Sequence, residues 1–415
     1  MLDIVSYLSS NIILEGIPIS VQNRQMEDQA MSNFEVDLQR IDTQFNGESN
    51  LCWVHARAAT APDGIALITT QPLRMSGADI FYGINTLYSG DKGKSWRKPL
   101  PQKGLERFAS GDTELLMCDA TPGYHVASGK FIMTGTIVIY RNDEFTPHPR
   151  RSFIANSVFD NDSKQWDHVQ LLKMPEGAGD PFFAASAGCT QWVELENGNI
   201  LVPFYFRSRA AATEPSRISD VAVALCSFDG KKLNLIKIGE SLHINEKRGL
   251  SEPSICRIGN EFYLTIRSDE RGYVARSPDG LNFRDMKEWL FDDGTELGSY
   301  NTQQHWVTHR NELYLVYTRR GADNDHVSRN RAPLFIARVD IDKLHVIRST
   351  EISVVPNRGA TLGNFGCNHV GPDESWIVAS EWMHTTNPNP YDWRKCMSYG
   401  SDNSIFVSKL RWRHV

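Results

Sequence analysis

Ser89-Gly90-Asp91-Lys92-Gly93-Lys94-Ser95-Trp96 is the stretch of sequence that predicts the fold, and it reads S-x-D-x-G-x-S-W. An Asp followed two residues later by Gly can accept hydrogen bonds from the backbone N–H groups of its own turn, while the Gly adopts the strained dihedral. The Ser adds a second local hydrogen bond, and the Trp anchors the turn to the adjacent strands. The segment therefore predicts a tight turn between two β-strands.

Two degenerate copies of this turn occur later in the chain. Ser227-Phe228-Asp229-Gly230 follows a strand-like run at 221–226. Ser277-Pro278-Asp279-Gly280 follows a similar run at 273–276 and is completed by an aromatic residue, Phe283. A turn that recurs after β-runs, with an Asp and an aromatic anchor, indicates a repeated all-β unit.

The first segment resembles the Asp-box, or BNR repeat, of the sialidase (neuraminidase) superfamily of β-propellers, and the two copies support the resemblance by their placement. The resemblance implies an all-β fold, a six-bladed β-propeller, with five blades as the alternative. In that family the box is structural and staples a hairpin away from the catalytic face. It therefore predicts the fold, and the function must be argued from other residues.

Short β-like runs dominate the rest of the chain, and several are β-branched or aromatic and bounded by Gly, Asp, Asn or Pro. They lie at 64–71, 79–88, 130–140, 199–207, 221–227, 261–267, 312–318, 334–339, 375–381 and 404–410. A helical period is visible only near residues 25–38. We expect a single propeller domain at residues 46–415, preceded by an N-terminal extension at residues 1–45 that could supply the strand closing the last blade.

The composition restricts the kinds of partner. The 415 residues carry a net charge of −6 and no basic tract, so we expect no nucleic-acid partner. No apolar run approaches the ~18 residues of a membrane span, so no membrane contact is expected. The first residues lack a basic segment and a cleavage site, which predicts a cytoplasmic protein unless a leader has been removed. The seven Cys are scattered without a C-x-x-C pair, as is typical of reduced, buried thiols.

The resemblance extends from about residue 51 to the C-terminus, and it implies a set of site residues. Sialidases open the first blade with an Arg, and Arg57 in the segment VHARAA at 54–59 occupies that place, with His55 as a further substrate-binding candidate. The Ile-Pro pair that follows the Arg in those enzymes is absent here. Asp79, in the segment GADI at 77–80, corresponds to the general-acid Asp. A turn residue at a strand edge is the alternative interpretation of Asp79.

The middle of the chain gives the closest correspondence to the family. Glu252 is followed by a strand, then by Arg267, and then by the third turn, which is the order of the catalytic Glu and the second carboxylate-binding Arg in sialidases. Arg331, immediately before the strand at 334–339, corresponds to the third Arg, with Arg329 as the alternate. A planar guanidinium binds a carboxylate through two hydrogen bonds, so three such Arg imply an anionic sugar. A surface ion pair is the alternative interpretation of Glu252 and Arg267.

One departure from the family concerns the nucleophile. Sialidases use a Tyr on the last blade, activated by the Glu, and the corresponding position in this chain is Phe365. A Phe has no hydroxyl group and cannot attack an anomeric carbon. The sequence therefore does not predict the retaining mechanism that depends on this Tyr.

Histidines could supply acid–base chemistry in the absence of the Tyr. Gln304 and His305 lie in a polar and aromatic segment at 300–306, and His326 lies in the loop that carries Arg331. Because His exchanges a proton near neutral pH, we expect His305 to be catalytic, with Gln304 and His326 binding substrate. A structural role is the alternative for each His. Further candidates are Asp119, His125, His369 and Glu381. No spacing resembles a zinc site, so we expect no metal and no cofactor.

The leading hypothesis is a glycoside hydrolase that removes a terminal acidic sugar, such as a sialic, ulosonic or uronic acid, from an oligosaccharide or glycoconjugate. Asp79 would protonate the leaving oxygen, and Glu252 with His305 would activate water. A lyase acting on uronates is the alternative, because Arg residues that neutralise a uronate carboxylate acidify the proton α to it. A non-catalytic carbohydrate-binding propeller is the third interpretation. The sequence does not predict the identity of the sugar or the oligomeric state.

Overall fold

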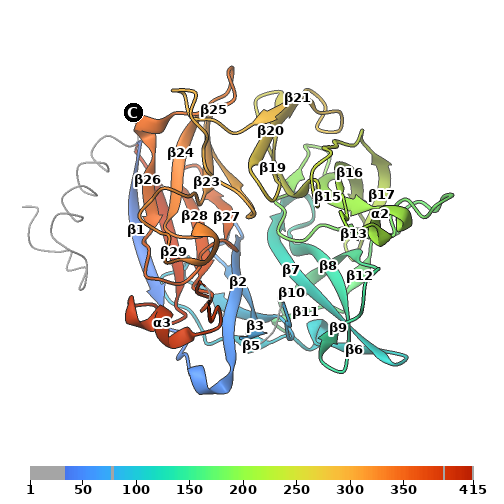
Figure 1. Cartoon of the computed structure of the whole chain (residues 1–415), viewed down its shortest axis with the longest axis horizontal. Coiled ribbons are helices and arrows are strands. Elements are labelled where there is room, and N and C mark those ends of the chain that lie inside the picture. The colour runs from blue at the N-terminus through green and yellow to red at the C-terminus, as the bar shows by residue number, and fades with distance from the viewer. Residues whose placement is uncertain (1–32, 76–78, 387, 414–415) are drawn as a thin grey trace, which may run out of the picture.

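The computed structural model describes residues 33–75, 79–386 and 388–413. Within these ranges the chain consists mainly of antiparallel β-strands, which hydrogen-bond into six sheets. Figure 1 shows the sheets side by side around a central axis, in chain order from blue to red. The prediction of an all-β propeller is therefore confirmed.

The first three sheets use consecutive strands of the chain. The first sheet contains β2 (Leu51–Thr60), β3 (Ala66–Arg74), β4 (Asn85–Ser89) and β5 (Leu100–Pro101). The second contains β6 (Phe108–Ser110), β7 (Thr113–His125), β8 (Lys130–Arg141), β9 (Glu144–Phe145), β10 (Phe153–Asp160), β11 (Gln165–Trp166) and β12 (Gln170–Leu171). The third contains β13 (Ala184–Ser186), β14 (Val193–Glu194), β15 (Ile200–Arg207), β16 (Asp220–Phe228) and β17 (Leu233–Ile238).

The remaining sheets complete the ring. The fourth contains β18 (Ser251–Ile258), β19 (Glu261–Arg267), β20 (Gly272–Ser277) and β21 (Arg284–Glu288). The fifth contains β22 (His305–His309), β23 (Glu312–Tyr317), β24 (Leu334–Asp340), β25 (His345–Val346) and β26 (Ile352–Val355). The sixth contains β27 (Gly366–Gly371), β28 (Glu374–Ser380), β29 (Ile405–Trp412) and β1 (Phe34–Ile41). Two short helices, α2 (Arg209–Thr213) and α3 (Trp393–Ser398), lie in loops.

The sixth sheet combines strands from the two ends of the described chain. β1 pairs with β29 in antiparallel register, from Phe34 opposite Trp412 to Ile41 opposite Ile405. Apolar and polar residues alternate along the start of β1, which is the period of a strand with one buried face. The helical period expected near residues 25–38 is therefore wrong for 34–38, and residues 25–32 lie outside the described residues.

The Asp91 turn joins β4 to β5 through its own hydrogen bonds. Asp91 Oδ1 accepts the backbone N–H groups of Lys94 and Ser95 at 3.1 and 3.0 Å. Ser89 Oγ accepts the N–H of Gly93 at 2.9 Å, and Gly93 has a φ of +66°, which a residue with a side chain rarely adopts. The local interactions that the residue types predict are thus present in the folded chain.

The same turn connects the first sheet to the sixth. Trp96 packs edge to face against Trp376 of β28, with ring centres 6.1 Å apart. The indole N–H of Trp96 donates to Gln39 of β1 at 3.2 Å. The aromatic anchor therefore fastens the turn across the junction at which the two ends of the chain meet.

Comparable turns follow the third strand of four other sheets. In each of them an Asp carboxylate accepts backbone N–H groups of its own turn, and these residues are Asp160, Asp229, Asp279 and Asp340. Antiparallel connections alternate between the two ends of a sheet. The loops that follow the second strand of each sheet therefore lie at the end opposite to these Asp turns. These loops, at 79–84, 142–152, 208–219, 268–271, 318–333 and 381–386, form what we call the loop face.

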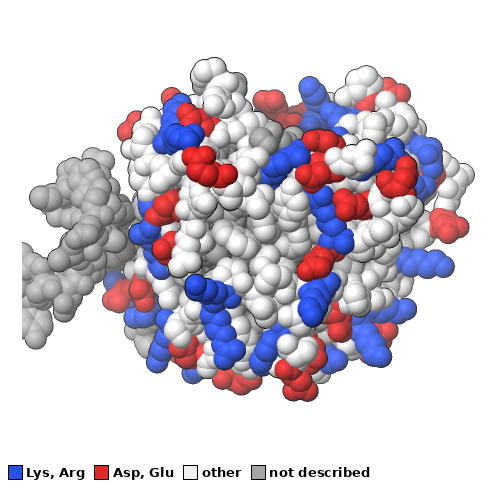
Figure 2. Space-filling model, turned by 90° about the horizontal axis from the view of Figure 1, so that it is seen from below, with Lys and Arg blue, Asp and Glu red and all other residues white. Residues whose placement is uncertain are grey.

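The outer surface of the ring has a mixed charge. Figure 2 shows one side of the molecule, on which Lys and Arg are interspersed with Asp and Glu around an area of other residues. Apolar side chains fill the spaces between neighbouring sheets, where Trp166, Trp306 and Trp376 are fully buried. No helix in the described part of the chain is long and apolar enough to cross a membrane.

Candidate active site

Polar residues in left-handed backbone conformations occur on the inner strands, which lie closest to the axis. His55 on β2, Asp119 on β7 and Glu252 on β18 have φ values of +59°, +56° and +45°, each at a register shift of its strand. Asn301, which precedes β22, has a φ of +49°. A β-bulge changes the direction in which a side chain points from its strand. Residues with a strained backbone of this kind cluster at functional sites. Four sheets thus each present one polar side chain.

Two buried arginines meet at Asn301. Arg267 donates to the carboxylate of Glu252 and to the side-chain oxygen of Asn301, and Arg331 donates to the backbone oxygen of Asn301. Arg267 and Arg331 are 6% and 4% exposed, yet the Nε–H of each has no partner among the described residues. Burial and the charges of Arg267 and Arg329 lower the pKa of Arg331 to about 9. An anion here would satisfy both donors and relieve the repulsion.

Glu252 and Asp79 have opposite shifts in pKa. Burial acts to raise the pKa of Glu252, but the attraction of Arg267 and other arginines outweighs it, so the pKa is lowered. Asp79 is exposed in the loop after β3, at a φ of +54°, where surrounding loops displace part of its hydration. This loss of solvation and the charge of Asp119 raise the pKa of Asp79. Two carboxyl groups whose pKa values are pushed apart suit an acid and a base.

His55 is buried against Asp119. The Nδ1 of His55 lies 3.2 Å from Asp119 Oδ1, and its Nε2 lies 2.7 Å from the side-chain nitrogen of Asn364. Burial and the charge of Arg57 hold the pKa of His55 well below its usual value, so the ring is neutral. Burial also raises the pKa of Asp119. The two side chains form a polar wall of the site, and His55 does not contribute a positive charge.

Arg57 lies inside the propeller and does not bond to Asn301, at which Arg267 and Arg331 meet. Its side chain is fully buried, and a Cβ at Gly366 would lie 2.7 Å from Arg57 Cγ, so this glycine makes room for it. Its donors bond to protein acceptors, which are Phe365 O at 3.1 Å, Ala120 O at 3.0 Å, Gln303 Oε1 at 3.2 Å and Cys189 Sγ at 3.0 Å. The structure thus brings two of the three predicted carboxylate-binding arginines together and gives Arg57 internal partners.

Gln304 and His305 are buried in the packing between sheets. Gln304 bonds to Thr265 Oγ1 at 3.0 Å, and His305 Nδ1 lies 2.8 Å from Ser254 Oγ. Burial lowers the pKa of His305 to about 3, so it carries no proton to donate as an imidazolium at neutral pH. Neither residue has a hydrogen bond to Asp79 or Glu252 in the described structure.

His326 shares a loop with Arg331 but points to other neighbours. Its ring stacks on Tyr399 with centres 4.5 Å apart, and its Nε2 lies 3.2 Å from the side-chain nitrogen of Asn357. These contacts hold three loops against one another. The arrangement gives His326 a packing role and does not place it beside Glu252 or Asp79.

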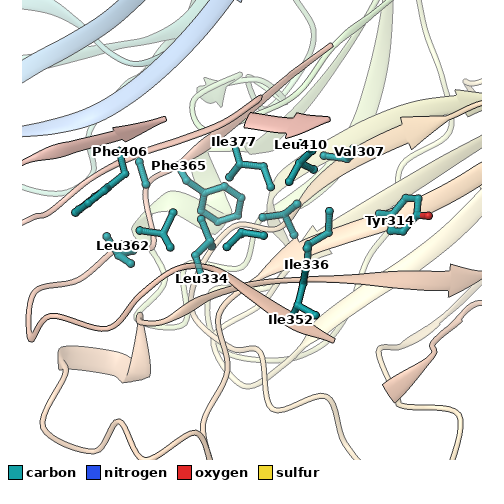
Figure 3. Packing of buried hydrophobic residues seen from close by; sticks show 14 of the residues in the cluster. Val307, Tyr314, Leu334, Ile336, Ile352, Leu362, Phe365, Ile377, Phe406 and Leu410 are labelled. Atoms are coloured by element: carbon teal, nitrogen blue, oxygen red, sulfur yellow. The ribbon is translucent and has the colours of Figure 1, made fainter. Parts of the chain in front are cut away.

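Phe365 is part of the hydrophobic core. Its side chain is fully buried, and Figure 3 shows it among Leu334, Leu362 and Ile377. Its backbone oxygen accepts the Nε–H of Arg57. The side chain of Phe365 therefore packs inward between two sheets.

The site also contains Tyr205, which the sequence analysis did not single out. Tyr205, half-buried on β15, lies close enough to Glu252 and Asp119 for their charges to act on it. Burial and these two carboxylates raise the pKa of Tyr205, so its hydroxyl stays protonated. In the sequence Tyr205 is one aromatic residue in a strand-like run, which predicts packing and nothing more.

Metal ligands are not gathered in the described residues. No group of three or more His, Cys, Asp and Glu side chains within them could hold a metal ion.

Comparisons with known proteins show similarity in structure at low sequence identity. No protein family model matches the chain, and no curated protein sequence is similar to it. A protein of unknown function from Dyadobacter fermentans is 14% identical, with a TM-score of 0.59 over 91% of this chain and 99% of that one. Trypanosoma rangeli sialidase is 13% identical, with a TM-score of 0.57 over 89% of this chain. A Hadza microbial sialidase is 12% identical, with a TM-score of 0.58 over 89% of this chain and 68% of that one.

The fold is that of a sialidase-like β-propeller. The chain spans 59% of the length of the trypanosomal enzyme. Identities this low establish the fold alone, because one fold carries many activities. The activity of this sialidase-like propeller must be argued from its own site.

Proposed function

We propose that this protein is a glycoside hydrolase that removes a terminal acidic sugar from an oligosaccharide. The observation that carries the proposal is the pair of buried arginines at Asn301. Arg267 and Arg331 each keep a buried Nε–H without a partner, and Glu252 is the acidic group hydrogen-bonded to Arg267. Such an excess of buried positive charge favours a ligand with a carboxylate.

The proposed roles follow from the charges in the site. Arg267 and Arg331 bind the sugar carboxylate, and Arg57 supports the wall behind them through its internal hydrogen bonds. Asp79, whose pKa is raised, donates a proton to the leaving oxygen. Glu252, whose pKa is lowered, stays ionised and either activates water or stabilises positive charge on the anomeric carbon. His305 has no role in this mechanism because it is buried and bonded to Ser254.

Structural neighbours support an acidic sugar as the ligand. A solved structure of Trypanosoma rangeli sialidase, similar to this chain with a TM-score of 0.57, is a complex with sialic acid. That ligand carries the carboxylate that the paired arginines of this chain would bind. Sialic, ulosonic and uronic acids share this group, so the proposal covers the class of acidic sugars.

A substrate panel tests the proposal. Aryl α-sialosides and oligosaccharides ending in uronic acids are incubated with the wild-type protein and Asp79→Asn, and products are followed by mass spectrometry and near-ultraviolet absorbance. We expect release of a free acidic sugar by the wild type and its loss in the variant. A product that absorbs in the near ultraviolet would replace the hydrolase with a lyase, and binding without turnover would make the protein a carbohydrate-binding propeller.

A further inference from the structure

A second group of arginines lies on the loop face, on the second and third sheets. Arg150 follows β9 in the loop at 142–152, Arg207 ends β15, and Arg217 follows α2 in the loop at 208–219. We call these three residues the arginine cluster. Arg267 and Arg331 belong to the fourth and fifth sheets, so the cluster is separate from the carboxylate-binding pair.

The arginine cluster has no acidic partner. Among the described residues, none of its three guanidinium groups lies within 4.0 Å of a carboxylate, although the chain has 50 Asp and Glu. Asp180, in the same region, pairs instead with Arg151 at 2.5 Å and Arg209 at 3.2 Å. The protein has a net charge of −6, so an excess of basic residues in its composition does not explain why these three arginines lack acidic partners.

The contacts within the cluster are with neutral groups. Arg150 stacks over the ring of Phe145 at 4.3 Å, and its buried Nε–H has no partner in the described residues. Arg217 Nη1 lies 2.7 Å from His148 Nε2. Burial and the charges of Arg150, Arg217 and Arg207 lower the pKa of His148 to about 4, so this His is neutral and accepts the hydrogen bond. The guanidinium groups are therefore held in place but not neutralised.

The cluster adjoins the candidate active site. Asp79 attracts Arg150, and Arg207 lies on the same strand, β15, as Tyr205, on which the charges of Glu252 and Asp119 act. Burial and the charge of Arg217 lower the pKa of Arg150. The loop face thus presents two cationic groups, and the charge of Asp79 interacts with Arg267 and Arg331 in one group and with Arg150 in the other.

We propose that the arginine cluster is a second anion subsite, which binds a carboxylate or sulfate on the sugar next to the terminal acidic sugar. The inference rests on the proposed function, since it places the terminal sugar at Arg267 and Arg331. The substrate is then an oligosaccharide with negative charges on two successive residues. Each guanidinium can give charge-assisted hydrogen bonds to that second anion, and binding relieves the repulsion within the cluster.

Calorimetry with uncleavable thio-linked probes tests the subsite without turnover. We use two series of probes, one ending in sialic acid and the other in galacturonic acid. Each series contains three disaccharides, in which the second sugar is neutral, carboxylated or sulfated. For the wild type we expect the carboxylated or the sulfated probe of one series to bind at least about tenfold more tightly than the neutral one. The preferred member of the pair identifies the second anion. Equal affinities in both series would overturn the proposal.

Variants test whether the gain in affinity for the carboxylated or sulfated probe comes from the arginine cluster. Arg150→Gln and Arg217→Gln should lose the preference for two charges while keeping the affinity for the neutral-second-sugar probe. Arg209→Gln is the matched control, because Arg209 is nearby, exposed and paired with Asp180. Removing a repelled charge should leave the unfolding temperature unchanged or raise it, which separates lost binding from misfolding. A preference that survives both cluster variants contradicts the subsite.

The two proposals fail in different ways. Hydrolysis of acidic sugars without any preference for a second charge would keep the glycosidase and overturn the subsite. A preference for the doubly charged probe without hydrolysis of any substrate would keep the subsite and overturn the glycosidase.

Discussion

His305 and Phe365 meet edge to face near the axis of the propeller, with ring centres 5.0 Å apart and ring planes at 85°. Both side chains are buried, at 1% and 0% exposure. Phe365, which the sequence resemblance led us to expect at the position of the family's nucleophile, is thus a core residue whose neighbour is a neutral His. The functional groups of the candidate active site consequently come from residues other than His305 and Phe365.

Restoring a hydroxyl at this position should not create a catalyst. Phe365→Tyr would bury a phenol among apolar side chains, and we expect a loss of about 1–3 kcal/mol in the free energy of unfolding. Phe108→Tyr serves as the control, because Phe108 is 43% exposed and should tolerate the change. Urea denaturation measures both variants. A Phe365→Tyr protein of unchanged stability and higher glycosidase activity would show that residue 365 can reach the site.

Asp79→Asn should abolish proton donation. We expect kcat/KM for a sialoside or uronoside to fall about 100- to 10,000-fold, with an unchanged circular dichroism spectrum. In the wild type, activity should fall as pH rises through the raised pKa of Asp79, because the acid must be protonated, and fall at low pH as Glu252 gains a proton. The variant should lack the high-pH decrease. Asp63→Asn, in an exposed turn after β2, is the control and should retain the wild-type profile.

The all-β fold was predictable because its signal is local. The Asp91 turn needs only its own residues to form its hydrogen bonds, so its sequence predicts its structure. The turns at Asp160 and Asp340 use the same carboxylate contacts but lack the Ser-Asp-Gly pattern, and the sequence did not indicate them. The helical period near 25–38 failed at 34–38, where pairing with β29 over a whole strand determined the structure.

The site was less predictable because its contacts are long-range. Arg267 and Glu252 lie 15 residues apart and are paired, and an ion pair between them was only the alternative interpretation of their order in the sequence. The burial of Arg57 depends on residues from 63 to 308 positions away, which no local pattern contains. Tyr205 reaches the site only because the third sheet packs beside the fourth. Sequence order therefore identified the charged residues but could not show which of them lie in the interior.

Arg331→Gln should separate binding from stability. The variant loses a charge that Arg267 and Arg329 oppose, so we expect the free energy of unfolding to be unchanged or higher. Affinity for an acidic monosaccharide, measured by calorimetry, should fall about 10- to 100-fold through loss of charge-assisted hydrogen bonds. Arg284→Gln, exposed at the start of β21, is the control. Unchanged affinity in Arg331→Gln would remove this residue from the binding site.

Glu252→Ala should have the opposite effect on stability. Arg267 would remain buried without its acidic partner, at a cost of about 3–5 kcal/mol in the free energy of unfolding. The folded-state pKa of Glu252 is lowered, so its contribution is present above the unfolded value of about 4.3 and is lost as pH falls through the folded value. The difference between wild type and variant should therefore shrink in acid. A difference that is constant with pH would contradict the ion pair.

Glu381 should make the protein less stable at neutral pH than in mild acid. Burial raises its pKa to about 7, although Arg358 Nε lies 3.5 Å from its carboxylate. The unfolded chain releases this proton near pH 4.3, so the free energy of unfolding should fall by roughly 4 kcal/mol between that pH and about pH 7 and then level off. Glu381→Gln should remove this decrease, whereas Glu106→Gln, at an exposed position, should retain it. Denaturation at pH 5 and pH 8 measures the effect, and equal pH dependence in Glu381→Gln and wild type would show that this carboxyl group is ionised in the fold without penalty.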